Sequence, residues 1–303
     1  MTGGERPLRY YPRSKRGKCE ISLSIYWGCY ASTKQYCVEA STRSVLKSLG
    51  INAKEIEGWS CCGHPFKGIN PKLWLYLASR NLSLAGEGEL LTVCNGCYLS
   101  LKEAQHLIKS RKEVAEWVKR ALAMEGLEYS EPDVLHTVEF FHECLGDMEL
   151  ARPLKGLRLG AHYGCHSIRG SFNGFDEAKN PSKLEDILEM LGAEVVREYP
   201  GRLDCCGATL MAIDPDIGFT LASSKITRSL EAELQGLVTP CPYCFEMLDS
   251  RQDTLTELKG TPSMPVLLLQ QAIGFAQGIG RKELGLNFNM SPVEKILKDM
   301  IGD

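Results

Sequence analysis

Ten of the thirteen cysteines fall into two sets of five that share one order along the chain. Each set has a single cysteine, then two adjacent cysteines followed by glycine, then a Cys-x-x-Cys pair. A structural zinc site takes four protein ligands, and an ordinary cubane iron–sulfur cluster also takes four. Five soft thiolates therefore favour a soft metal or an iron–sulfur assembly in each set. The first set is Cys29, Cys61, Cys62, Cys94 and Cys97, and the second is Cys165, Cys205, Cys206, Cys241 and Cys244.

The adjacent cysteines are the most restrictive part of this pattern. Neighbouring residues do not easily chelate one tetrahedral ion, but they can reach two different iron atoms of one cluster. Three other interpretations stay open: zinc in one or both halves with one cysteine idle, buried structural cysteines, and a thioredoxin-type redox pair. The other three cysteines, Cys19, Cys37 and Cys144, have no counterparts in the repeat and are predicted to be ordinary small hydrophobes.

The segments around the cysteines also repeat, which predicts an internal duplication. Two short β-type runs, ISLSIYWGCY and LRLGAHYGCH, reach the first cysteine of each set, and an amphipathic helical pattern follows each run. Pro71 and Pro215 each stand ten residues after the first cysteine of an adjacent pair, and LAS recurs at 77–79 and 221–223. Each Cys-x-x-Cys then follows another apolar, strand-like run.

This order predicts an α/β fold of two pseudo-repeated halves, each with a small, mainly parallel sheet flanked by helices. Ligands of such sheets gather beyond the carboxyl ends of the strands, so metal clusters are expected there, between the halves. We expect an N-terminal arm over 1–20, a first half with connecting helices over 21–150, and a second half with a C-terminal tail over 151–303. A charged amphipathic helix is predicted over 100–125, and a further helix in HTVEFFHECL.

Composition excludes several classes of protein. The net charge of −3 argues against nucleic acid as a partner. No uncharged apolar run reaches the roughly 18–20 residues that span a bilayer. The basic stretch RPLRYYPRSKRGK lacks the apolar core of a signal peptide. With the odd cysteine count and the long spacings, which argue against a disulfide framework, these features predict a cytoplasmic, reducing location.

Taken together, the motifs resemble the cysteine-rich CCG family, and most closely the B-type subunits of the heterodisulfide reductases of methane-metabolising archaea. The resemblance covers nearly the whole chain after residue 20. It implies two non-cubane [4Fe–4S] clusters, one in each half, with the five cysteines of each set as the ligands. The stretches that carry it include EASTRSVLKSLG, EGWSCCGHP, TVCNGCYLSLKEA, HYGCH, DCCGA, CPYCFEMLD and PVLLLQQAIGFAQGIGRKELGLN.

The resemblance also implies an activity, the reductive cleavage of the disulfide between coenzyme M and coenzyme B. Two clusters that face each other across a cleft would each supply one electron to one sulfur of the substrate. Histidine is the natural proton donor near neutral pH. We expect His166, which follows Cys165 directly, to be the donor, with His64 second and His162 a weaker candidate. The histidines at 106, 136 and 142 are predicted to be surface or core residues.

The substrate's sulfonate, phosphate and carboxylate groups need cationic partners. Lys67, Arg169 and Arg202 lie near the motifs, although a basic residue is more often simply solvated.

The chain has neither a ferredoxin-type cysteine run nor a Gly-x-Gly-x-x-Gly fingerprint, so it needs an electron-supplying partner. The resemblance implies two partners in the same complex, an iron–sulfur subunit of the C type and a flavin-containing subunit of the A type. Two alternatives stay open: a CCG-family electron-transfer subunit for another substrate, as in glycolate, lactate, fumarate or sulfur metabolism, and a zinc-bearing docking subunit.

Overall fold

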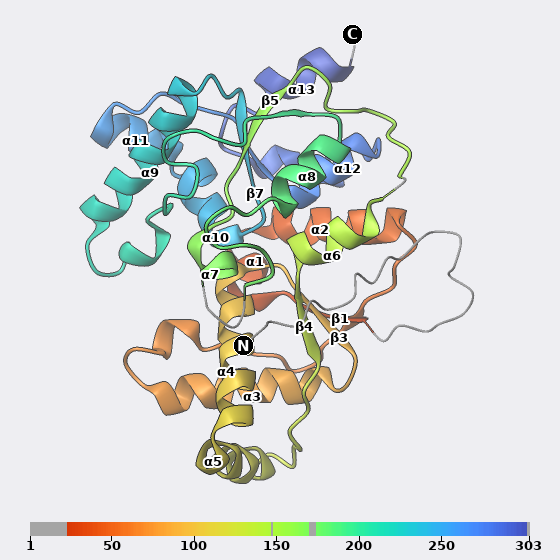
Figure 1. Cartoon of the computed structure of the whole chain (residues 1–303), viewed down its shortest axis with the longest axis vertical. Helices are drawn as coiled ribbons and strands as arrows, with labels where there is room; N and C mark the ends of the chain where they lie inside the picture. Colours follow the sequence, from red (N-terminus) through yellow and green to blue (C-terminus); the bar gives the residue numbers. More distant parts are fainter. Residues whose placement is uncertain (1–22, 147, 170–173, 302–303) are drawn as a thin grey trace.

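The structure, a computed structural model, describes residues 23–146, 148–169 and 174–301. It contains two four-stranded parallel sheets, one from each half of the chain, flanked by helices (Figure 1). The predicted α/β fold with two pseudo-repeated halves is confirmed. The predicted arm over 1–20, with Cys19, lies outside the described residues.

The first sheet has the strand order β2-β1-β3-β4, and the second has the matching order β6-β5-β7-β8. Strands β1, β3 and β7 are buried along their whole length, as is typical of parallel strands covered on both faces. The strands of the first sheet are β1 (Leu23–Tyr26), β2 (Lys54–Glu55), β3 (Glu89–Thr92) and β4 (Asp133–His136); those of the second are β5 (Arg158–Ala161), β6 (Glu194–Val195), β7 (Gly236–Thr239) and β8 (Val266–Leu268).

The helices occupy corresponding places in the two halves. The first half has α1 (Gly28–Thr33), α2 (Tyr36–Ser48), the 3₁₀ turn η2 (His64–Phe66), α3 (Pro71–Ala85), α4 (Asn95–Ser110), α5 (Lys112–Ala123) and α6 (Thr137–Cys144). The second has α7 (Cys165–Ile168), α8 (Lys183–Met190), η3 (Ala208–Leu210), α9 (Pro215–Glu231), α10 (Pro242–Phe245), the π-helical turn η4 (Glu246–Ser250), α11 (Gln252–Lys259), α12 (Leu269–Ala276), η5 (Leu286–Phe288) and α13 (Glu294–Ile301).

The repeated prolines mark helix starts. Pro71 and Pro215 are the first residues of α3 and α9, a position where the missing N–H costs nothing. The side chain of Asn70 caps α3 by accepting a hydrogen bond from the Leu73 N–H, at 3.1 Å. Asp214 caps α9 in the same way. These caps fix where each helix begins after its pair of adjacent cysteines.

Two features of the bridging region differ from the sequence-based expectation. The single helix predicted over 100–125 is two helices, α4 and α5, because Arg111 takes an extended conformation between them. The segment that follows contributes β4 to the first sheet, a strand that the sequence analysis missed. The helix predicted in HTVEFFHECL is present as α6.

Helices near the middle of the molecule tie the halves together (Figure 1). Helix α12, late in the chain, packs on α2, and α6 packs on α8. Polar contacts follow the same path: the Gln35 side-chain amide donates to Glu246 at 2.6 Å, and the Ser44 hydroxyl donates to the Glu283 carbonyl at 3.0 Å. Within the described ranges, the helices are all too short or too polar to cross a lipid bilayer.

Candidate metal centre

One open cavity between the halves brings together all ten cysteines of the two predicted sets. Its volume is about 910 Å³, including the solvent at its mouth. Helices α4 and α7, and α1 and α10, meet beside it near the centre of Figure 1. Each set enters from the carboxyl ends of its own strands, where the sequence predicts a ligand site. The cysteines are free thiols, and they share the cavity wall with His64, His166, Tyr30, Tyr243 and Asn95, among others.

In the first set, the thiols form a connected network. The Cys29 thiol donates to the Cys61 sulfur over 3.8 Å. This hydrogen bond, with a second from Cys62, lowers the pKa of Cys61 to about 2. Cys94, the N-cap residue of α4, and Cys97, in its first turn, extend the network. The first cysteine of the adjacent pair is therefore the one that most readily carries the negative charge a metal requires.

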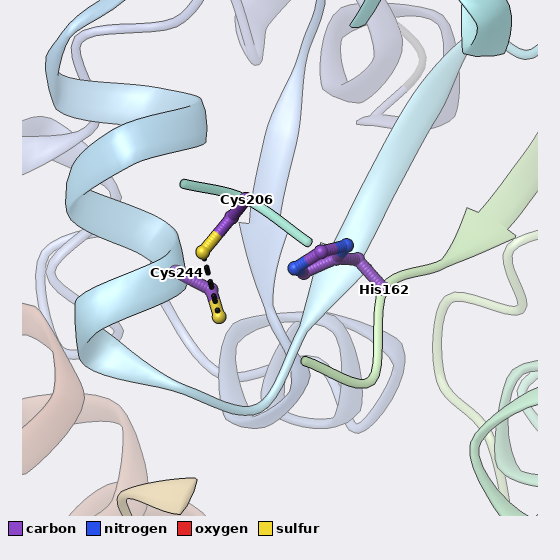
Figure 2. Close-up of side chains that lie close together, drawn as sticks. All are labelled: His162, Cys206 and Cys244. Carbon is purple, nitrogen blue, oxygen red and sulfur yellow. Dashed lines mark hydrogen bonds between the residues drawn. The ribbon is translucent and has the colours of Figure 1, made fainter. Parts of the chain in front are cut away.

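The second set repeats this arrangement. Cys165 stabilises the thiolate of Cys205 and lowers its pKa to about 2. The Sγ atoms of Cys206 and Cys244 lie 3.3 Å apart, within hydrogen-bonding distance (Figure 2). The two sets meet where Cys94 contacts Cys241. The two sets of thiols therefore lie next to each other within one cavity.

The glycine of each Cys-Cys-Gly motif is required by its backbone conformation. Gly63 and Gly207 have φ angles of 79° and 78°, in the left-handed region that favours glycine. At Gly207 the backbone N–H points back and donates to the Cys205 sulfur at 3.3 Å. Glycine therefore turns the chain so that its own amide supports the preceding thiolate.

The two predicted proton donors lie against each other in the cavity, although they come from opposite halves. The ring centroids of His64 and His166 are 4.7 Å apart in an edge-on arrangement. Burial, followed by the charges of His166 and Lys67, lowers the pKa of His64 to about 4. His64 is therefore a neutral imidazole at neutral pH.

Sequence reasoning missed a polar connection that crosses between the halves. Asn95, inside the first Cys-x-x-Cys, donates its side-chain amide to the Tyr163 carbonyl of the second half at 2.6 Å. Its Oδ1 lies 2.8 Å from the Nε2 of buried His136, whose Nδ1 accepts from the Val138 N–H. His136 is thus a core residue, as predicted, but it orients a residue of the cavity. The one available signal was the amide residue between two cysteines.

His162 is more deeply buried than His64 and His166, and it belongs to the second half. It follows β5 and is 1% exposed. Burial lowers its pKa to about 3, with a smaller effect from Lys225. A ring nitrogen and the Sγ atoms of Cys206 and Cys244 all lie within 4.8 Å of one another. Figure 2 shows the ring pointing toward the two sulfurs.

The comparisons with known proteins agree with this geometry. A family model described as the CCG cysteine-rich domain matches residues 23–102 and 159–249, and each match contains one of the two sets of five cysteines. This chain belongs to the CCG cysteine-rich domain family. The resemblance predicted from the motifs is therefore confirmed, and the chain is an iron–sulfur subunit of that family.

Several curated CCG relatives extend over nearly the whole chain. The chain is 32% identical to the B-type subunit of a ferredoxin:CoB-CoM heterodisulfide reductase of Methanosarcina mazei, over 88% of this chain and 93% of that protein. It is 31% identical to a protein of Archaeoglobus profundus described as similar to the same type of heterodisulfide reductase subunit, over 93% and 98%. It is also 32% identical to an 8-methylmenaquinol:fumarate reductase membrane anchor subunit of Wolinella succinogenes, over 90% and 98%.

A solved structure shares the fold. The crystal structure of a hypothetical protein from Helicobacter pylori superposes with a TM-score of 0.74 at 16% identity. The match covers 90% of this chain and 52% of the other. At that identity the likeness supports the fold alone.

The donor set of this CCG protein fits iron–sulfur clusters. Soft thiols in groups of five, mostly buried and without disulfides among the described residues, match the ligand preference of iron–sulfur centres. His64 Nδ1, in the cavity wall, and both ring nitrogens of His162, beside Cys206 and Cys244, are buried and have no hydrogen-bond partner among the described residues. A group bound among the cysteines would supply such a partner.

Of the described cysteines outside the two sets, Cys37 and Cys144 do not line the cavity. Cys37 is fully buried and bonds to Gln35, as expected of a small core residue. Cys144, at the end of α6, is only half-buried.

The three basic candidates for anion binding have protein partners. Arg202 is buried against Glu185, with its Nη2 2.6 Å from a carboxylate oxygen, and it supports the fold. Lys67 pairs with Glu103 at 2.5 Å, and Arg169 donates to the Leu203 carbonyl at 2.9 Å. Of the three, Arg202 is the least suited to bind a substrate.

Proposed function

We propose that this chain is the catalytic subunit of a CoB–CoM heterodisulfide reductase. In this proposal the halves at 21–150 and 151–303 each hold one non-cubane [4Fe–4S] cluster through the five cysteines of their set. The observation that carries the proposal is the single cavity that all ten cysteines share with His64 and His166. The heterodisulfide reductase relatives of the B type, which match along nearly the full chain, add independent support.

Reduction of the disulfide needs two electrons and two protons, and it yields two thiols. When bound, the clusters would supply one electron to each sulfur of the substrate. The cysteines would hold them on facing walls, so that the S–S bond fits between the two halves. The protein itself contributes the shape of the cavity and the placement of protons.

His166 is the proposed proton donor, because it follows Cys165 in the single turn of α7 and lines the cavity. His64 packs against it from the other half and is held neutral by burial. We assign His64 the role of orienting the His166 ring beside one substrate sulfur, and of donating an N–H hydrogen bond to the other substrate sulfur.

The electrons come from partners in this proposal. An iron–sulfur subunit of the C type would pass them to this chain, and a flavin-containing subunit of the A type would stand behind it. Related proteins are named as subunits of heterodisulfide reductases, which supports a multi-subunit setting. The free thiols support a reducing compartment such as the cytoplasm.

The test is metal analysis followed by turnover, both under anaerobic conditions. We expect about eight iron atoms per chain, four for each cluster. We also expect viologen-linked reduction of the coenzyme M–coenzyme B disulfide. Zinc with little iron would refute the cluster assignment and favour a docking subunit. Full iron without disulfide reduction would refute the substrate but leave the clusters in place.

A second candidate function comes from the Wolinella relative. Its name places it in a quinol-dependent fumarate reductase, so we propose electron transfer within such a complex as the alternative. In that case the chain would hold its clusters and exchange electrons with a partner, while the disulfide would give no turnover. The same two measurements therefore distinguish the candidates.

A further inference from the structure

His162 occupies a fixed position at the edge of the second set of cysteines. It continues the line of β5, and its backbone N–H donates to the Val238 carbonyl at 2.8 Å. The side chain is buried, and neither ring nitrogen has a hydrogen-bond partner among the described residues. Buried polar atoms are nearly always paired, so this ring indicates a partner that the protein atoms do not provide.

The surroundings of the ring show what kind of partner it would meet. A ring nitrogen lies within 4.8 Å of the Sγ atoms of Cys206 and Cys244, which are themselves 3.3 Å apart. In Figure 2 one ring nitrogen faces these two sulfurs. Both cysteines belong to the five thiols that would hold the second cluster. The ring therefore faces the place where thiolate or sulfide sulfur would lie.

The first half has no such donor at the matching position. Counting back three residues from the first cysteine of each set places Tyr26 opposite His162. The Tyr26 hydroxyl already donates to the Ser60 carbonyl at 2.6 Å. Its hydrogen is therefore used within the protein, whereas the His162 ring has at least one N–H that no described residue accepts.

We propose that His162 donates a ring N–H hydrogen bond to a sulfur of the second iron–sulfur site, and so raises its reduction potential above that of the first site. This inference rests on the proposed function, because it requires a cluster in the second half. A hydrogen bond to cluster sulfur stabilises the negative charge that reduction adds. His162 is thus a positioning residue that acts through the cluster. An electron shared between the halves resides preferentially in the second.

The test is an EPR-monitored redox titration of the anaerobically purified protein with its clusters in place. His162→Phe removes the donor, His162→Gln keeps an N–H, and Tyr26→Phe is the matched control in the first half. For His162→Phe we expect one midpoint to fall by at least a tenfold change in the reduction equilibrium, about 59 mV for one electron. His162→Gln should recover part of the shift, and Tyr26→Phe should leave that midpoint unchanged.

Iron content separates the alternatives. An unchanged midpoint in a His162→Phe protein with full iron overturns this inference and leaves the proposed function intact. Loss of about four iron atoms in both His162 variants also overturns it, because His162 would then be a ligand or a structural support. Pulsed EPR of wild-type protein with ¹⁵N-labelled histidine adds a test without a substitution. A weak ¹⁵N coupling that His162→Gln removes supports the hydrogen bond, and a strong, directly ligated coupling contradicts it.

Discussion

The two halves share their sulfur chemistry but differ in the residues that surround it. In both, a left-handed glycine precedes the first cysteine, and another follows the adjacent pair. In both, the first cysteine of that pair has its pKa lowered to about 2 by a thiol from the same relative position. The duplication therefore preserved the ligand frame, while the neighbouring polar residues diverged.

The divergence places histidine and tyrosine in different parts of the cavity. His64 of the first half corresponds to Ala208 of the second, and His166 of the second half corresponds to Tyr30 of the first. The imidazole pair has ring centroids 4.7 Å apart, and Tyr30 packs on Tyr243 at 4.8 Å. The cavity thus pairs its imidazoles with each other, and its tyrosines with each other.

The sizes of the residues at these corresponding positions also differ between the halves. A Cβ atom at Gly96 would lie 3.7 Å from the His64 ring, an ordinary contact, so the imidazole packs directly beside this small residue. The position that corresponds to Gly96 in the second half is Tyr243, whose large ring is matched by the small Ala208. The comparison teaches that the arrangement of cysteines is symmetric, whereas the imidazole and phenol side chains around it are not.

Removing a thiolate from either half should produce the largest effect. We expect Cys61→Ser and Cys205→Ser each to lose about four iron atoms and all disulfide turnover, because the hydroxyl is a much poorer iron ligand. Iron analysis and the viologen assay measure both outcomes. Cys37→Ser is the control, since this buried thiol lies outside the cavity. Turnover in Cys205→Ser protein would show that the halves are not equal partners.

The next largest effect should come from the imidazole pair, and it should exceed the effect of changing the tyrosine pair. We expect His166→Phe to lower kcat by about 10²–10⁴, the range for loss of a general acid. Tyr30→Phe, which changes the corresponding position of the first half, should stay well below that range. Both variants should keep their iron. Equal losses in the two variants would contradict a one-sided delivery of protons.

The ligand frame was predictable because it is a matter of residue type and spacing. The ten cysteines, the repeat and the parallel layering all follow from local patterns around Gly-Cys, Cys-Cys-Gly and Cys-x-x-Cys. The strand β4 was not predictable, because its four residues lie between helices and carry Asp133 and His136 at their ends. Its place in the sheet is set by pairing with β3, a contact distant in sequence.

The cavity's polar partners were predictable only in part. His64 and His166 stand beside cysteines, so their sequence position marked them. The link from Asn95 to Tyr163 joins residues 68 apart and depends on how the two halves dock. The burial of His162, and the lack of a hydrogen-bond partner for its ring nitrogens among the described residues, were not predictable, because they are properties of the packed structure.

Substituting the glycine that precedes the first cysteine of each set should have a smaller effect, of similar size in the two halves. A Cβ at Gly28 would lie 2.7 Å from the Cys97 sulfur, and one at Gly164 would lie 2.9 Å from the Cys244 sulfur. Both residues also have positive φ angles. We expect Gly28→Ala and Gly164→Ala to cost about 2–3 kcal/mol of stability and to lower iron content in the same half.

Gly96→Ala is the matched control for these substitutions. Its added Cβ meets the His64 ring at 3.7 Å, which is an ordinary contact, and the residue lies in α4. Thermal unfolding and iron analysis should show it close to wild type. Comparable losses at Gly96 and Gly28 would mean that crowding of the sulfur frame is not the cause.

The last comparison concerns the residues that hold the loop before each pair of adjacent cysteines. Asn81 accepts from the Ser60 N–H at 2.8 Å and donates to the Cys61 carbonyl at 3.2 Å. Lys225 is the corresponding residue of the second half, and it donates to the carbonyls of Gly201 and Arg202 at 3.0 and 2.8 Å. A neutral amide and a buried amine thus perform the same task.

Their removal should not cost the same. Asn81→Leu leaves a donor and an acceptor unpaired and should cost about 2–3 kcal/mol. Lys225→Met leaves acceptors unpaired, but it also removes an amine whose burial lowers its pKa to about 7. Relief of that desolvation offsets part of the loss, so we expect about 1–2 kcal/mol. Anaerobic urea unfolding measures both, with exposed Lys155→Met as a control within about 0.5 kcal/mol. A greater loss of unfolding free energy for Lys225→Met than for Asn81→Leu would contradict this expectation. It would show that the buried amine is a net stabilising group of the second half.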